Sequence, residues 1–189
     1  MRCILSAYTG DSLVQHRAYL RVYAARTPPI DVVNGSQKMP ELPEIETIRR
    51  KLVESILDGT ISGARLLRRD VLRDTQGRRK GGVGHQKTLL ENDQIKTIER
   101  MGKQLYLEGS SGKGLLIRLG MSGKLIVQEH TQPQTASHCH ASWVVRDSNG
   151  RQLGMHFIDP RRFGGLFATT CREDLQGRFW SRLGPDALK

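Results

Sequence analysis

The stretch Trp143–Phe157, WVVRDSNGRQLGMHF, decides what kind of fold the chain adopts. Apolar residues gather on both sides of Asn149-Gly150, and in the second half they alternate with other residues. Alternation with period two is typical of a half-buried strand, and Asn-Gly between two apolar runs is the strongest short-range signal for a hairpin. We therefore predict a pair of antiparallel strands here.

Outward from this hairpin the chain reads mostly as short strands. Further short or alternating apolar runs occur at 61–67, 95–107, 115–127 and 165–169. Residues 74–88 interrupt them with a basic, glycine-rich loop, and a short helical patch is expected near 172–181. Such a succession of short strands favours a β-sandwich.

A helix is predicted before the strands, over residues 43–57. Apolar residues recur there at spacings of three and four, which describe one face of a helix, and Asp58-Gly59 supplies a stop signal. The residues of this face are Leu42, Ile45, Ile48, Leu52 and Ile56. The fold class expected is α+β, a single β-rich sandwich domain with a long N-terminal α-helix.

Composition limits the functional classes. The 189 residues are 37% hydrophobic and 5% aromatic, which predicts one modest core, and the net charge of +11 predicts attraction to a polyanion such as nucleic acid. No apolar run approaches the roughly 20 residues that span a bilayer, so no membrane partner is expected. The three cysteines are too few and too scattered for a disulfide framework, which fits a reducing, cytoplasmic location.

Residues 1–38 differ from the rest of the chain. They show no sustained apolar period and contain the breakers Thr27-Pro28-Pro29 and Asn34-Gly35-Ser36. We interpret this segment as a leader that is disordered or lies upstream of the true start at Met39.

Three segments carry a resemblance to a known family. They are Met39–Thr47 (MPELPEIET), Arg118–Leu125 (RLGMSGKL) and Asp159–Gly164 (DPRRFG), supported by Lys103, His138-x-His140 and Leu183–Leu188. In order and spacing they resemble the N-terminal catalytic domain of the formamidopyrimidine-DNA glycosylase and endonuclease VIII family. Met121 before Ser-Gly, and the DPRRFG run, favour the formamidopyrimidine branch.

The resemblance implies that Pro40 and Glu41 are catalytic. In the family the secondary amine of an N-terminal proline attacks the sugar C1′ of the damaged nucleotide, and a carboxylate at the position of Glu41 moves protons. An α-amino group has a pKa of about 7.7–8, so a useful fraction is neutral at pH 7. As written, however, the Pro40 nitrogen is an amide with Met39, so this chemistry requires translation from Met39 or proteolysis there.

The resemblance also implies a set of DNA contacts. Lys103 matches the family's catalytic-site lysine, which grips the phosphate beside the lesion. Arg118 stands where the formamidopyrimidine branch usually has a histidine that contacts phosphate, and Arg162 and His138 are expected to bind DNA as well. For Lys103 the alternative is an ordinary exposed surface lysine.

A second group is implied to act when the damaged base is flipped out. Met121, Arg161 and Phe163 match the three side chains that fill the gap left in the duplex. The alternative for Met121 and Phe163 is an ordinary place in the core, but each lies beside glycine in a polar turn, which suits a loop tip better.

No metal site is expected in this chain. The histidines at 130, 138, 140 and 156 lack the spacing of a structural zinc site, although His138 and His140 could share one face of a strand. In the family a zinc finger belongs to a second domain with a helix–two-turn–helix. We expect 39–182 to be the catalytic domain and 183–189 the start of the linker to that second domain.

The expected function is base-excision repair: a DNA glycosylase with apurinic/apyrimidinic lyase activity on 8-oxoguanine and formamidopyrimidines, here as a truncated catalytic domain. The expected partner is double-stranded DNA with oxidised bases or abasic sites, bound by a monomer in the cytoplasm, at the nucleoid if the source is bacterial. Two alternatives stay open. One is an inactive, basic DNA-binding remnant, and the other is an endonuclease VIII-like glycosylase for oxidised pyrimidines.

Overall fold

A computed structural model describes residues 41–73, 88–130 and 137–186. The leader expected at 1–38, Pro40 and the basic loop expected at 74–88, except Thr88, lie outside these residues. Within the described ranges no helix is long and apolar enough to cross a membrane.

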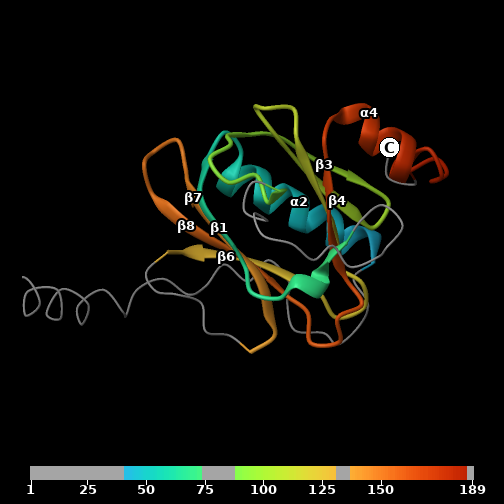
Figure 1. Cartoon of the computed structure of the whole chain (residues 1–189), viewed down its shortest axis with the longest axis horizontal. Coiled ribbons are helices and arrows are strands. Elements are labelled where there is room, and N and C mark those ends of the chain that lie inside the picture. The colour runs from blue at the N-terminus through green and yellow to red at the C-terminus, as the bar shows by residue number, and fades with distance from the viewer. Residues whose placement is uncertain (1–40, 74–87, 131–136, 187–189) are drawn as a thin grey trace, which may run out of the picture.

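Two β-sheets face each other (Figure 1). The first has the order β1-β7-β8-β6, with β1 at Thr60–Leu66, β6 at Lys124–Glu129, β7 at Cys139–Arg146 and β8 at Gln152–Ile158. The second has the order β2-β9-β5-β4-β3, with β2 at Leu72–Arg73, β3 at Ile95–Met101, β4 at Gln104–Gly109, β5 at Gly114–Arg118 and β9 at Gly165–Thr169. Neighbouring strands are antiparallel except β2 and β9.

The predicted hairpin is confirmed as β7 and β8. Their pairing runs as far as Arg146 and Gln152, and the turn between them is held by the carboxylate of Asp147, which accepts hydrogen bonds from the backbone N–H groups of Asn149 and Arg151. Gly150 has a φ of +81°, in the left-handed region, which explains why the turn uses Asn-Gly.

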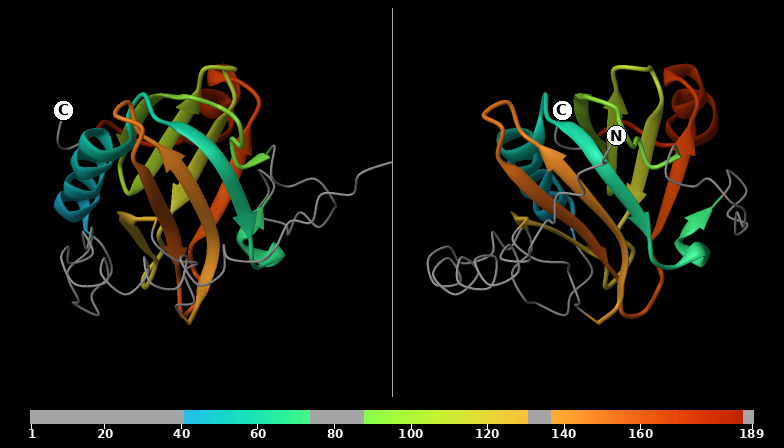
Figure 2. Two further views of the ribbon diagram at one scale, coloured as in Figure 1. Left: turned by 90° about the vertical axis from the view of Figure 1, so that its left-hand side faces the viewer. Right: turned by 60° about the vertical axis from the view of Figure 1, so that its left-hand side comes forward.

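Helix α2 (Leu42–Ile56) confirms the predicted helix to within one residue at each end. Ile45, Ile48, Leu52 and Ile56 are buried, as their spacing predicts. The helix packs against β3, β4 and β6 and closes one open side of the sandwich (Figure 2).

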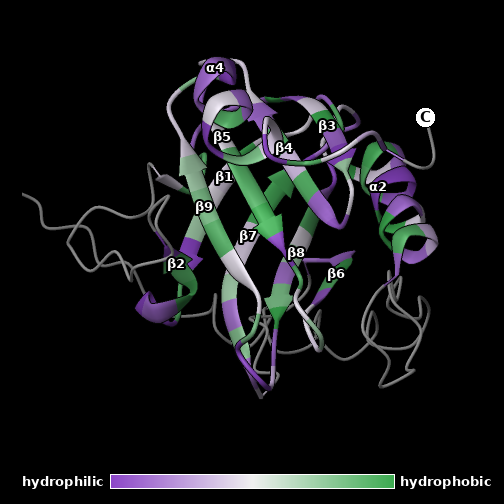
Figure 3. Cartoon of the chain, turned by 90° about the vertical axis from the view of Figure 1, so that its right-hand side faces the viewer, coloured by the Kyte–Doolittle hydropathy of each residue, from purple (hydrophilic) through white to green (hydrophobic). Residues whose placement is uncertain are grey.

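The main core lies between the two sheets and α2, and a smaller apolar cluster covers the outer face of the second sheet. Adjacent β5 residues divide between them, because Leu115 and Ile117 join the main core while Leu116 joins the smaller cluster. Over this outer face lie α4 (Arg172–Leu175) and the π-helical turn η2 (Gln176–Trp180), which together form the helical patch expected near 172–181 (Figure 3).

The sandwich with a long N-terminal helix is therefore the α+β fold that was expected. A short 3-10 helix, η1 (Arg69–Val71), and the two-residue strand β2 were not predicted. Both are too short to show a period.

Candidate functional site

Three chain segments far apart in sequence lie toward one side of the sandwich. They are the N-terminal end of α2, the β5–β6 turn at 119–123 and the β8–β9 loop at 159–164 (Figures 1 and 2). The β3–β4 turn joins them through the contact described next. Residues of all three quoted motifs therefore come to one side of the molecule.

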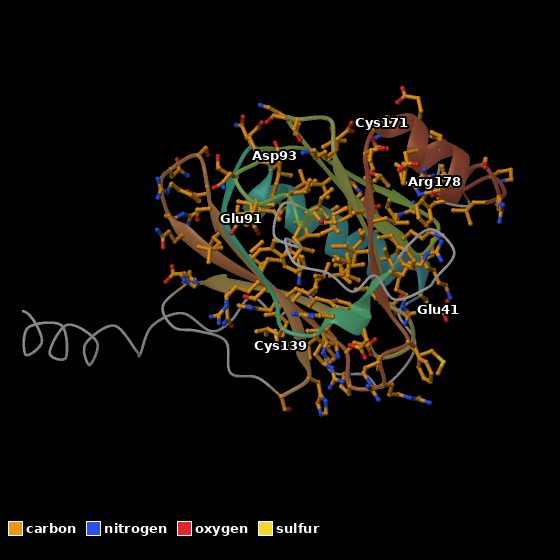
Figure 4. The ribbon with its side chains drawn as sticks, viewed as in Figure 1. Glu41, Glu91, Asp93, Cys139, Cys171 and Arg178 are labelled. Atoms are coloured by element: carbon orange, nitrogen blue, oxygen red, sulfur yellow. The ribbon has the colours of Figure 1, made fainter. Side chains whose placement is uncertain are left out.

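Glu41 and Lys103 form an ion pair. The ammonium nitrogen of Lys103 lies 2.7 Å from Oε2 of Glu41, and their side chains are 44% and 57% exposed. Glu41, which is labelled in Figure 4, stands immediately before the N-terminal end of α2. Lys103 lies in the two-residue β3–β4 turn, whose first residue, Gly102, has a φ of +54°. Glycine at that position is typical of a tight hairpin turn.

A buried arginine, Arg100, is hydrogen-bonded to this turn. The side chain of Arg100 is only 4% exposed. Its Nε donates to Oε2 of Glu46 at 3.0 Å, and its Nη1 donates both to Oδ2 of Asp186 at 2.7 Å and to the carbonyl of Gly102 at 3.1 Å. Burial works against the charge of Arg100, but the bonds to Asp186 and Glu46 outweigh it and raise the pKa of the guanidinium.

Glu46 links the same network to α2. It accepts two hydrogen bonds from Arg49, at 3.0 and 2.7 Å, and one from Arg50 at 3.1 Å, besides that from Arg100. The bond from Arg49, opposed by burial and assisted by Arg100 and Arg50, lowers the pKa of Glu46 to about 2. This carboxylate therefore stays ionised and tied to its partners over the whole physiological range.

Asp159 connects the β5–β6 turn with the β8–β9 loop. Its side chain is fully buried; Oδ1 accepts from the hydroxyl of Ser122 at 2.5 Å and Oδ2 from the backbone N–H of Gly164 at 2.7 Å. The backbone N–H of Arg161 in turn donates to the Ser122 oxygen at 3.2 Å. A carboxylate that holds two loops at once makes them a single rigid unit.

Met121, Arg161 and Phe163 project from this unit. Met121 is 36% exposed and Phe163 is 53% exposed, so neither occupies the core. The guanidinium carbon of Arg161 lies 4.9 Å from the centroid of the Phe163 ring, within cation–π range. The guanidinium and the aromatic ring thus stand together on the surface, and the exposed thioether of Met121 lies in the turn that Asp159 joins to their loop.

Arg118 lies apart from these tips. Its guanidinium carbon is 4.8 Å from the ring centroid of Phe167 and 5.4 Å from that of Phe179, on the outer face of the second sheet. Within the described residues its Nε is buried without a hydrogen-bond partner. Burial, together with the charge of Arg73, lowers the pKa of the guanidinium.

The remaining predicted residues lie in the β8–β9 loop and just before β7. Arg162 is paired with Asp70 at 3.4 Å, and its carbonyl accepts from Arg73 at 3.3 Å. His138 is exposed and precedes β7 with a φ of +65°, whereas His140 is buried and bonded to the carbonyl of Asp159 at 2.7 Å. The idea that these two histidines share one strand face is therefore wrong, because the backbone turns at His138.

Neither a nucleophile nor a zinc site can be placed in the described part of the chain. Pro40 falls just outside it, so only its position next to Glu41 in the sequence is known. Among the residues that are described, no three His, Cys, Asp or Glu side chains gather as metal ligands would.

Comparison with known proteins identifies the family of the chain. The sequence model of the family described as formamidopyrimidine-DNA glycosylase N-terminal domain matches residues 39–166, more than half of the chain. The chain belongs to this family.

Curated formamidopyrimidine-DNA glycosylases are similar along most of the chain. The protein from Corynebacterium urealyticum is 34% identical over 142 residues, covering 75% of this chain and 47% of its own length. The one from Teredinibacter turnerae is 38% identical over 153 residues, covering 79% and 50%. The chain thus spans about half the length of the curated glycosylases that it matches.

Solved glycosylase structures share the fold. A mutant glycosylase crystallised with THF-containing DNA has a TM-score of 0.61 at 25% identity, covering 75% of this chain and 47% of that one. The Lactococcus lactis formamidopyrimidine-DNA glycosylase, bound non-covalently to DNA with an abasic site, has a TM-score of 0.61 at 24% identity, covering 77% and 51%. At that identity the second likeness shows the fold alone.

Several residues of the candidate site were not predicted. Arg100 had no signal, since a charged residue on an edge strand usually faces solvent. Glu46 stood inside the quoted Met39–Thr47 segment without any role. Asp159 and Ser122 stood inside quoted motifs, but only tertiary structure shows that they bond to each other. Asp186 also stood in a quoted match, the Leu183–Leu188 segment, without any role.

Proposed function

We propose that the chain is the catalytic part of a DNA glycosylase with apurinic/apyrimidinic lyase activity, acting on 8-oxoguanine and formamidopyrimidines in duplex DNA. One observation carries the proposal. Glu41, which follows Pro40 in the chain, pairs with Lys103. The β5–β6 turn and the β8–β9 loop, which carry the exposed Met121, Arg161 and Phe163, lie toward the same side of the molecule as the N-terminal end of α2 (Figure 1). The names of the curated relatives and the DNA-bound structural neighbours support it.

The proposed nucleophile is the nitrogen of Pro40 once Met39 has been removed. The free secondary amine attacks C1′ of the damaged nucleotide, and the C1′–N bond to the base breaks as the base takes up a proton. The C1′–O4′ bond of the sugar ring then breaks with a proton going to O4′, which leaves an iminium between protein and sugar. The iminium draws electrons from C2′, so loss of a C2′ proton expels the 3′ phosphate by β-elimination. Glu41, beside Pro40 in the chain, is the group proposed to move protons at the sugar or the departing base.

Lys103 is proposed to hold the phosphate next to the lesion. Because both side chains of the Glu41–Lys103 pair are substantially exposed, a phosphate oxygen can reach the ammonium without displacing core residues. An exposed ion pair of this kind contributes no more than about 1 kcal/mol of stability, so replacing Glu41 by a phosphate as the partner of Lys103 costs little free energy.

The exposed group on the two joined loops is proposed to replace the flipped base. Extruding a nucleotide costs a few kcal/mol of stacking and pairing. Met121 and Phe163 can supply stacking, and Arg161 can donate hydrogen bonds to the base left unpaired. The bracing by Asp159 keeps these side chains in place before DNA arrives.

Borohydride trapping tests the proposal. The chain beginning at Pro40 and the chain that retains residues 1–39 are each incubated with duplex DNA containing 8-oxoguanine or an abasic site, and sodium borohydride is added. We expect a covalent adduct only with the first form, because an amide nitrogen cannot form an iminium. Glu41→Gln, as a control on the Pro40 form, should bind the 8-oxoguanine duplex yet fail to release the base.

The outcomes separate the alternatives. Binding of lesion DNA by the Pro40 form without an adduct on either substrate would contradict the proposal and favour a DNA-binding remnant. Adducts on thymine glycol but not on 8-oxoguanine would point instead to a glycosylase for oxidised pyrimidines.

A further inference from the structure

The last described residue, Asp186, contacts the β3–β4 turn. Asp186 lies 84 positions after Gly102 in the chain, yet its side chain is 1% exposed and pairs with Arg100. Its Oδ2 accepts two hydrogen bonds, from Nη1 of Arg100 at 2.7 Å and from the backbone N–H of Gly102 at 3.2 Å.

Together Asp186 and Arg100 hold both backbone polar groups of Gly102. The N–H of Gly102 donates to Asp186, and its carbonyl accepts from Arg100 at 3.1 Å. Gly102 also has the left-handed backbone conformation that the turn requires, and Lys103 follows it directly. Where the Lys103 backbone lies is therefore set by this pair of buried charges.

The other end of Arg100 fixes the same turn to α2. Its Nε bonds to Glu46, one helical turn inside the helix that Glu41 precedes. Glu46, Arg100 and Asp186 thus form one chain of charge-assisted bonds, which are stronger and more directional than bonds between neutral groups. We call these three residues the clasp.

We infer that Asp186 is a positioning residue, which keeps Lys103 beside Glu41 through Arg100 and Gly102. The position of residues 183–186 therefore affects the position of Lys103 in the candidate active site. The inference rests on the proposed role of Lys103 for its functional consequence, while the clasp itself is independent of that role. Residues 183–186 therefore connect the domain to the residues that follow and also help to form the candidate site.

The clasp is tested without DNA by amide hydrogen exchange of Gly102. In Asp186→Ala the Gly102 N–H loses its acceptor, so we expect its exchange to accelerate by about tenfold or more relative to wild type. Asp186→Asn keeps an oxygen for this N–H and should restore most of the protection. Unchanged Gly102 exchange in Asp186→Ala would overturn the inference.

The functional consequence is tested by a double-mutant cycle. Affinity for a duplex carrying a tetrahydrofuran abasic-site analogue is measured for wild type, Asp186→Ala, Lys103→Ala and the double variant. We expect Asp186→Ala to weaken binding about fivefold when Lys103 is present and less than about twofold when Lys103 is already removed. Equal losses in both backgrounds would mean that Asp186 only stabilises the fold, and would overturn its positioning role.

Asp147 provides a matched control. It too is a buried carboxylate that accepts from hairpin N–H groups and pairs with an arginine, Arg151, but it does so in the β7–β8 turn. Asp147→Ala should lower stability without changing affinity for the abasic duplex. Should wild type and Lys103→Ala bind this duplex equally, the proposed role of Lys103 fails, and Gly102 exchange alone then decides whether the clasp exists.

Discussion

At the scale of single residues, buried carboxylates organise this domain. Asp159 has no exposed surface and yet lies in a loop, which is tolerated because both of its oxygens accept hydrogen bonds, from Ser122 and from Gly164. The bond to Ser122 is the one that crosses between the two loops. Its loss would leave a buried carboxylate oxygen without that partner.

We predict that Ser122→Ala lowers the free energy of unfolding by about 1–3 kcal/mol, because Asp159 Oδ1 loses its hydroxyl partner. Urea denaturation measures this change. Ser62→Ala is the control, since Ser62 is exposed and makes one longer bond, 3.3 Å, to the carbonyl of Val144. Equal effects of the two substitutions would show that Asp159 does not depend on Ser122.

At the scale of elements, local sequence patterns predicted the helix and the strands well, but they did not predict the contacts between loops. The spacing of Ile45, Ile48 and Leu52 predicts α2 because a helix places such residues on one face whatever surrounds it. The alternation in β8 works in the same way. How the β5–β6 turn meets the β8–β9 loop is different, because two loops in contact share no period.

Gly120 shows how close that contact is. Its φ is +65°, and a Cβ added to it would lie 2.6 Å from the backbone nitrogen of Gly164. Gly112, with a φ of +79°, has no atom within 4 Å of such a Cβ. The two glycines therefore share a left-handed backbone and differ only in crowding.

We predict that Gly112→Ala costs about 1 kcal/mol of stability, from backbone strain alone. Gly120→Ala should cost about 1–3 kcal/mol more, because backbone atoms must move to admit the methyl group. Chemical denaturation of both variants gives the comparison. If the two costs are equal, the turn and the loop are not in rigid contact.

At the scale of the whole molecule, one buried histidine sets part of the response to acid. His156, in β8, bonds to the hydroxyl of Ser142 at 3.0 Å. Burial, assisted by the neighbouring His130, lowers the pKa of His156 from 6.5 to about 4. Between these two values the unfolded chain binds a proton at this residue that the folded protein does not bind, so stability falls as the pH falls.

We predict that stability declines from pH 6.5 toward pH 4 and that His156→Gln flattens this decline. The contribution at stake is on the order of 3 kcal/mol, fully present above pH 6.5 and lost once the pH reaches about 4. Unfolding free energies measured at several pH values in this window test it. An unchanged slope in His156→Gln would contradict the assignment.

The Glu46 carboxylate titrates in a separate window. Its folded pKa of about 2 lies below the usual glutamate pKa of 4.5, so the stability that it contributes is present above pH 4.5 and is lost as the pH falls toward 2. Because the two windows meet only near pH 4, the histidine effect can be read from the upper range alone.

The sequence by itself determined the local elements: the β7–β8 hairpin, the buried face of α2, and motifs specific enough to indicate the family. Each depends on residues within a few positions of one another, which backbone geometry brings together in any context. The tertiary structure alone decided that Lys103 pairs with Glu41, that Asp159 is buried, and that Asp186 reaches Arg100. These contacts join distant segments, and whether a charge is solvated or paired depends on what the packed sheets and α2 place beside it.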